Sequence, residues 1–150
     1  MNVLRAFVAL AVLAACSIAF AAEGLIEVES PYGVKETMNR LEDIVKQSDL
    51  NVFARIDHAA GAAKTGKSLR PTELLIFGNP QGGTPVMECA QSAGIDLPLK
   101  ALVWEDDSAT VWLGYNDPAW LAQRHQIADC PAIENLSKAL EQIAQAAVAP

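Results

Sequence analysis

The sequence predicts an α+β domain, a two-layer sandwich in which helices pack on one face of an antiparallel or mixed sheet of about five strands. Three observations lead to this prediction. Strand-like segments alternate with turn residues at regular places between residues 72 and 118. Two longer segments repeat apolar residues at helical spacing. Several strands follow one another directly or through short turns, which favours antiparallel pairing with the helices on one side.

The expected strands are short apolar segments bounded by turn residues. They span residues 25–28, 51–56, 72–77, 99–105 and 109–116. The third contains the unbroken apolar run from Leu74 to Phe77, which suits a buried central strand. Turn residues 106–108 join the last two strands as a hairpin, and the alternation along these strands predicts that one face of the sheet is wetter.

Helices are expected after residues 33, 84, 117 and 131, which gives the element order β-α-β-β-α-β-β-α-α. Thr84-Pro85 and Asp117-Pro118 each place a capping side chain before a proline at the first helical position. Pro131 opens the last helix. The first and last helices each carry an apolar face expected in the core. These faces consist of Val34, Met38, Leu41 and Val45, and of Ile133, Leu136, Leu140 and Ile143.

Residues 1–21 have the pattern of an export signal. Arg5 is the only charge, an apolar run extends to Phe20, and Ala19-Phe20-Ala21 is a small-x-small cleavage pattern. The run of about 15 residues is shorter than the roughly 20 of a membrane-spanning helix. We therefore expect a periplasmic or secreted single domain of residues 22–150.

A second processing route stays open, because residues 13–16 resemble the lipobox of bacterial lipoproteins. In that case the signal would be residues 1–15, Cys16 would be acylated, and the protein would be anchored to the membrane. The residues after Cys16 stay apolar, whereas a lipid-anchored chain usually continues with a polar tether, so we favour cleavage after Ala21.

The charge of the chain argues against nucleic-acid binding. The sequence has 11 basic and 18 acidic side chains and a net charge of −7. Contacts to phosphate backbones need a basic stripe, which an acidic chain lacks. We expect no nucleic-acid partner.

Two cysteines, Cys89 and Cys130, remain after cleavage at Ala21. An oxidising compartment favours closure of such a pair, so we expect a disulfide between them. The alternative is two buried thiols.

The segment from Gly61 to Ser68 matches the phosphate-binding loop pattern GxxxxGK[ST]. That loop must run from a strand straight into a helix so that backbone N–H groups converge on phosphate. Pro71 follows too closely to leave room for such a helix, and export removes the chain from cellular nucleotides. We reject nucleotide hydrolysis and expect this segment to connect two strands.

Two weaker sites are candidates for ligand binding. Lys64, Lys67 and Arg70 concentrate positive charge beside glycine-rich backbone, which can bind small anions, but we favour surface charge in a solvated loop or a subunit contact as their role.

His58, Lys100 and Tyr115 are candidates for a small-molecule pocket, because a few polar groups within an apolar wall define ordinary ligand sites. No arrangement of His, Cys and carboxylates has metal-site spacing, and we assign no metal, cofactor or catalytic residue.

Five sequence motifs occur in an order that resembles the domain-of-unknown-function 302 family. They are DHAAGAAK, RPTELLIFGNP, GTPVM, DLPLKALVWED and YNDPAWLAQRH. The resemblance covers about Gly24 to His125. It implies a small α+β domain, a homodimer, and a biochemical activity that is not established for the family.

The sequence therefore leaves two functional hypotheses. The favoured one is a non-enzymatic, dimeric, exported module that binds a small ligand or an envelope partner. The alternative is a small hydrolase or transferase that uses His58 with Lys100 or a nearby carboxylate.

Overall fold

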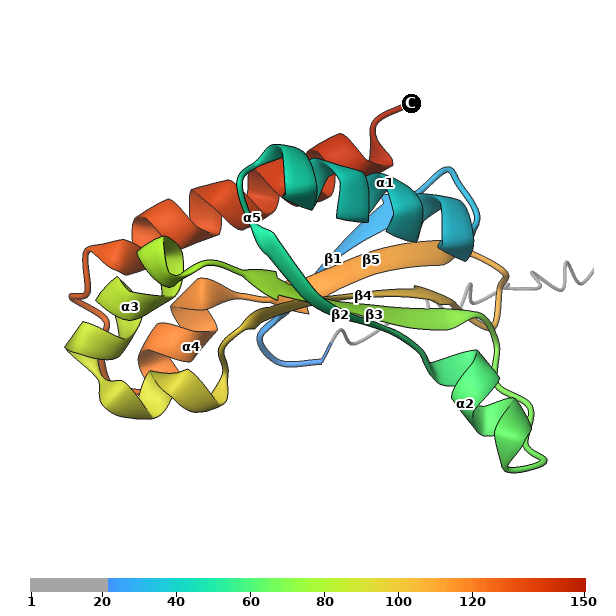
Figure 1. Ribbon diagram of the computed structural model, residues 1–150, viewed down its shortest axis with the longest axis horizontal. Coiled ribbons are helices and arrows are strands. Elements are labelled where there is room, and N and C mark those ends of the chain that lie inside the picture. The colour runs from blue at the N-terminus through green and yellow to red at the C-terminus, as the bar shows by residue number, and fades with distance from the viewer. Residues whose placement is uncertain (1–21) are drawn as a thin grey trace, which may run out of the picture.

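The computed structural model describes residues 22–150 and contains one five-stranded antiparallel sheet with strand order β1-β5-β4-β3-β2 (Figure 1). The strands are β1 (Leu25–Ser30), β2 (Asn51–Asp57), β3 (Thr72–Gly78), β4 (Leu99–Glu105) and β5 (Val111–Asn116). The helices are α1 (Val34–Gln47), α2 (His58–Lys64), α3 (Pro80–Cys89), the 3-10 helix η1 (Gln91–Ile95), α4 (Pro118–Arg124) and α5 (Ala132–Val148). The predicted α+β class is confirmed. The expected signal peptide and Cys16 lie outside the described residues.

The main core lies between the sheet and the helices α1 and α5, which run side by side over one face of it (Figure 1). Strand alternation turns Leu75, Phe77, Val103 and Leu113 toward the helices, and each of these side chains is fully buried. The predicted apolar face of α1 is buried as well. Burial of each such side chain stabilises the fold by about 1.5–3 kcal/mol. The sheet, α1 and α5 thus form the main packed layer of the domain, and the other elements pack at its ends.

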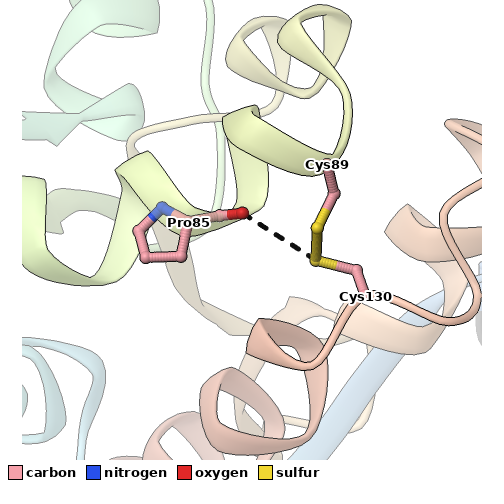
Figure 2. Close-up of a disulfide and its surroundings, with 3 residues drawn as sticks. All are labelled: Pro85, Cys89 and Cys130. Carbon is pink, nitrogen blue, oxygen red and sulfur yellow. Dashed lines mark hydrogen bonds between the residues drawn. A yellow bond between two sulfur atoms is a disulfide. The ribbon is translucent and has the colours of Figure 1, made fainter.

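A second, smaller core joins α3, η1, α4 and the start of α5 at one end of the sheet. It consists of Val86, Ala93, Ala122, Ile127, Cys130 and Ile133. The predicted disulfide is present: Cys89 at the end of α3 is bonded to Cys130, with Cα atoms 6.0 Å apart (Figure 2). Sγ of Cys130 also lies 3.9 Å from the carbonyl oxygen of Pro85, a van der Waals contact because a disulfide sulfur carries no proton.

The opposite face of the sheet has no helix packed on it among residues 22–150. We call it the open face. Its apolar side chains are half-buried, or exposed in the case of Ile56. Its apolar members are Ile56, Leu74, Ile76, Leu102, Trp104 and Trp112. The hairpin therefore does turn one face toward solvent, but the middle of that face is apolar rather than polar.

Two local features differ from the sequence prediction. The helix expected after Thr84 begins earlier, at Pro80, because Asn79 provides the same cap-plus-proline start: its Oδ1 accepts a hydrogen bond of 2.8 Å from the N–H of Gly82. Pro85 consequently lies inside α3. The second difference is the additional helix α2 between β2 and β3, which projects beyond the end of the sheet, away from α1 and α5 (Figure 1).

No helix within residues 22–150 combines the length and the apolar character that a bilayer crossing needs.

Candidate functional site

An apolar cleft of about 880 Å³ lies between α3 and α5. One wall is α3 with the residues that precede it, and the opposite wall is the side of α5 that contains Leu136, Ala139 and Ile143. Leu50, Phe53, Leu97 and Pro98 also line the cleft. Phe53 is 57% exposed because a β-bulge in β2 turns it out of the ladder. The size of the cleft matches that of a small-molecule site.

The chemistry of the cleft is neutral. No Asp, Glu, Lys, Arg or His side chain lines it, and its polar side chains are Asn79, Gln81, Thr84 and Asn135. Asn79 is already engaged, since it caps α3 and its Nδ2 donates to the carbonyl oxygen of Asp49 at 3.3 Å. A charged ligand buried here would lose its hydration without gaining an ion pair. The cleft therefore suits an uncharged, mainly apolar molecule.

The helical wall of the cleft is intrinsically weak. The α3 sequence contains Gly82, Gly83 and an internal Pro85, residues that are each unfavourable inside a helix. Val86 is its only buried residue. Tertiary contacts and the Cys89–Cys130 disulfide must therefore hold α3 in place, and Figure 2 shows this bond joining the end of α3 to the loop before α5.

The structure does not bring His58, Lys100 and Tyr115 together. Tyr115 lies in the main core with 4% exposure, and its burial, followed by nearby Glu141 and Asp117, raises the pKa of its phenol. Lys100 is on the opposite face of the sheet, where its Nζ donates to backbone carbonyl oxygens at 2.8 and 3.1 Å. His58 begins α2 at the other end of the sheet. None of the three lines the cleft.

The phosphate-loop motif has a different structural role. Its first half belongs to α2, and no helix follows Ser68. Gly66 has a φ of 73° and ends the helix: its N–H donates to the carbonyl of Ala63, and the N–H of Lys67 donates to that of Ala62. This is the Schellman arrangement that terminates many helices. The segment thus connects β2 and β3, as the sequence predicts.

The three basic candidates differ in their surroundings. Arg70 is paired with Asp107 at 2.6 Å. Lys64 and Lys67 are exposed beside the end of α2. Among residues 22–150, neither lysine forms an ion pair with an acidic side chain.

Sequence reasoning missed a hydrogen-bonded chain that links η1 to the end of α4. His125 Nε2 lies 2.5 Å from Asp96 Oδ2, and its Nδ1 lies 3.0 Å from Ser92 Oγ. Arg124 also pairs with Asp96, at 3.0 Å. The residue types resemble a catalytic triad, but Ser92 does not line the cleft. The arrangement therefore positions η1, and only the fold brings Asp96 within reach of His125.

The cleft itself gave no signal in the sequence. Its lining residues are mainly Gly, Pro, Leu and Ala from separate segments, which look like turn or core residues when taken one at a time. Within residues 22–150, no group of three or more His, Cys, Asp and Glu side chains could hold a metal ion.

Curated relatives match part of the chain. Proteins named "Fluoride-specific ion channel FluC 1" from Brucella suis and Brucella abortus are each 55% identical to it over 104 residues, or 69% of this chain. The matched segment is 41% and 38% of those two proteins, so the chain spans about two fifths of the length of these relatives.

A solved structure and a family model cover most of the chain. An uncharacterized conserved protein from Bacillus stearothermophilus has the same fold, with a TM-score of 0.67 and 24% identity over 85% of this chain and 97% of that one. The model described as "Domain of unknown function DUF302" matches residues 26–143, which include the cleft, the second core and most of the sheet and of the main core. The chain therefore belongs to the DUF302 family.

Proposed function

We propose that this protein is an exported, non-enzymatic module of the cell envelope that binds a small, uncharged, mainly apolar molecule in the cleft between α3 and α5. The observation that carries the proposal is the cleft of about 880 Å³ with no charged lining side chain. Apolar surface that is withdrawn from water on binding supplies the affinity, and the few polar side chains at the cleft orient the ligand.

Binding is favoured over catalysis because no nucleophile with an adjacent base lines the cleft. The competing candidate is a hydrolase or transferase that uses His58. That histidine is exposed at the start of α2, outside the cleft. Turnover of an ester or amide substrate that disappears in His58→Ala would support the enzyme and contradict the binding proposal.

Export is supported by two features of the chain. Residues 1–21 have the pattern of a signal peptide. The disulfide between Cys89 and Cys130 is of a kind that persists in oxidising compartments. Mass spectrometry of the protein from its host distinguishes cleavage after Ala21 from acylation at Cys16.

The binding site is tested by filling the cleft. Ala139 is an exposed residue of α5 that lines the cleft, so Ala139→Phe should place a ring in it without disturbing the core. We expect saturable fluorescence enhancement of the uncharged probe N-phenyl-1-naphthylamine with the native chain, and an affinity at least about tenfold lower with Ala139→Phe, equivalent to about 1.4 kcal/mol.

The matched control is Ala146→Phe. Ala146 is also exposed and lies two turns later on α5, outside the cleft. This variant should bind the probe like the native chain. Equal loss in both variants, or no loss in either, would show that the probe does not occupy the cleft and would overturn the proposal.

The proposed module is a homodimer that forms through the open face. An apolar sheet face of this kind is normally covered, and a second copy of the chain is the occupant that we propose. Glu27 and Glu29 flank the face at the β1 edge, and the apolar side chains of β4 and β5 lie at its centre. A twofold axis parallel to the strands would stack the apolar centres of the two copies and leave these glutamates at the rim of the contact.

The relatives favour a second candidate, in which the module binds an envelope protein. A segment 55% identical to this chain is part of proteins named as fluoride-specific ion channels. The module would then act beside such a channel. Saturable binding of the purified chain to a detergent-solubilised channel from the same organism supports this candidate, and unchanged thermophoresis across the titration contradicts it.

A further inference from the structure

We propose that the Cys89–Cys130 disulfide controls the cleft, so that the ligand binds to the oxidised protein and is released when the bond is reduced. This inference rests on the proposed function, because it concerns regulation of the same site. It depends on where the bond lies, on the weakness of the helix that it holds, and on the independence of the main core.

The disulfide joins the two walls of the cleft. Cys89 is the last residue of α3, and Met87, two residues earlier, lines the cleft. Cys130 directly precedes Pro131 and Ala132, which line the cleft from the start of α5. Figure 2 shows that the bond bridges these two segments. The separation of the walls is therefore fixed by a covalent link at one end.

Without that link, α3 has little to hold it. Two glycines and an internal proline make its ten residues poor helix formers. Its side-chain cap, from Asn79, lies at the opposite end from the disulfide. Val86 alone is buried. Reduction should therefore allow α3 to open locally, which removes one wall of the cleft.

The rest of the fold should survive reduction. The main core consists of residues of the sheet, α1 and α5, and includes neither cysteine nor any residue of α3. The disulfide belongs to the second core. Local opening of one unit while another stays folded is common in proteins whose cores are separate. Loss of the cleft need not unfold the domain.

The chemistry requires a dithiol reductant. Cys89 is exposed and Cys130 is 7% exposed, so a thiolate of the reductant would attack the sulfur of Cys89 and displace Cys130 as the leaving thiolate. The second thiol of the reductant then resolves the mixed disulfide. The protein gains two electrons and two protons as two thiols, and the reductant becomes a disulfide.

The test compares probe binding and hydrogen exchange in the oxidised and reduced states of the full chain. N-phenyl-1-naphthylamine is titrated with and without dithiothreitol, and with the Cys89→Ser/Cys130→Ser variant. The control is the native chain incubated with oxidised dithiothreitol, which leaves the bond intact. We expect at least tenfold weaker binding in the reduced chain and the double variant, native binding in the chain treated with oxidised dithiothreitol, and faster amide exchange confined to residues 80–90.

Each outcome decides the inference. Equal affinity in the oxidised and reduced states, with unchanged exchange in α3, would overturn it and leave the proposed function intact. Unfolding of the sheet on reduction, seen as fast amide hydrogen exchange throughout β3 and β4, would also overturn it. The disulfide would then stabilise the whole domain and would not control the cleft specifically. Failure of the oxidised chain to bind the probe would overturn the proposed function, while hydrogen exchange would still report whether the disulfide holds α3.

Discussion

At the scale of single residues, Gly114 determines how the open face is packed. It lies on that face in β5, directly opposite Leu102 of β4. The ring of Trp104 covers it so closely that a Cβ atom at this position would lie 2.8 Å from Cζ3 of the tryptophan. A glycine here lets a large aromatic ring lie flat on the sheet, which contributes to the apolar surface at which we place the dimer contact.

Gly114→Ala should therefore destabilise the fold by about 1–3 kcal/mol, the usual cost of overpacking. Urea denaturation followed by tryptophan fluorescence measures the change. Gly61→Ala is the control, because Gly61 lies in α2 with no atom close to an added Cβ and alanine favours helix. A Gly114→Ala variant as stable as the control would show that Trp104 moves aside without cost.

At the scale of the elements, the β4–β5 hairpin depends on the Asp106 carboxylate. Its Oδ2 accepts a hydrogen bond of 2.8 Å from Trp112 Nε1, and its Oδ1 accepts from the N–H groups of Ser108 and Thr110. These bonds favour the ionised form. The hydrogen bond from Trp112, and then that from Thr110, lowers the pKa of Asp106 below its ordinary value of 3.8.

The sign of the pH dependence follows from this lowered pKa. The stabilising effect of Asp106 should be present above pH 3.8 and should be lost as the pH falls through the lower pKa of the folded state. Nuclear magnetic resonance can follow the indole N–H of Trp112, which should shift as the carboxylate is protonated. Asp106→Asn should abolish that transition, and a transition that persists in this variant would assign it to another group.

The elements that could be predicted from the sequence are those with a strong local signal. The alternation in β4 and β5, the apolar face of α1 and the Asp117-Pro118 start of α4 were all recognisable. Helix α2 was missed because its seven residues bury no side chain and show no apolar period. The predicted start of α3 is too late, because two cap-plus-proline pairs, Asn79-Pro80 and Thr84-Pro85, lie within seven residues. The first pair begins the helix.

The candidate site was beyond sequence reasoning for a different reason. His58, Lys100 and Tyr115 were selected as polar groups, but the register of the sheet puts Lys100 and Tyr115 on opposite faces. The cleft depends instead on how far α3 stands from α5, a distance set by tertiary packing and by the disulfide. No short sequence pattern predicts the distance between α3 and α5.

At the scale of the whole molecule, the two faces of the sheet differ in what covers them. One is covered by α1 and α5 (Figure 1), and the other presents an apolar middle flanked by Glu27 and Glu29 at the β1 edge. If a second copy covers the open face, the described domain is half of the functional unit. The cleft at the end of the sheet would remain accessible, because it is formed on the helical side.

Leu102→Glu should convert the proposed dimer to a monomer. Leu102 lies in the central strand of the open face, where two buried carboxylates would face each other across a twofold axis. Sedimentation equilibrium measures the mass. Ile95→Glu is the matched control, since Ile95 is 73% exposed in η1, away from that face. A native chain that sediments as a monomer at micromolar concentration would contradict the dimer.

The first strand of the domain pairs with the last one: β1 lies against β5, from Leu25 opposite Asn116 to Ser30 opposite Val111. Helix α1 likewise packs on α5. An amino-terminal fragment thus lacks the partners of its own strand and helix, and native contacts this distant in sequence form slowly. The domain cannot complete its core before α5 has been synthesised, so the growing chain stays unfolded up to that point, which would favour the export that we propose.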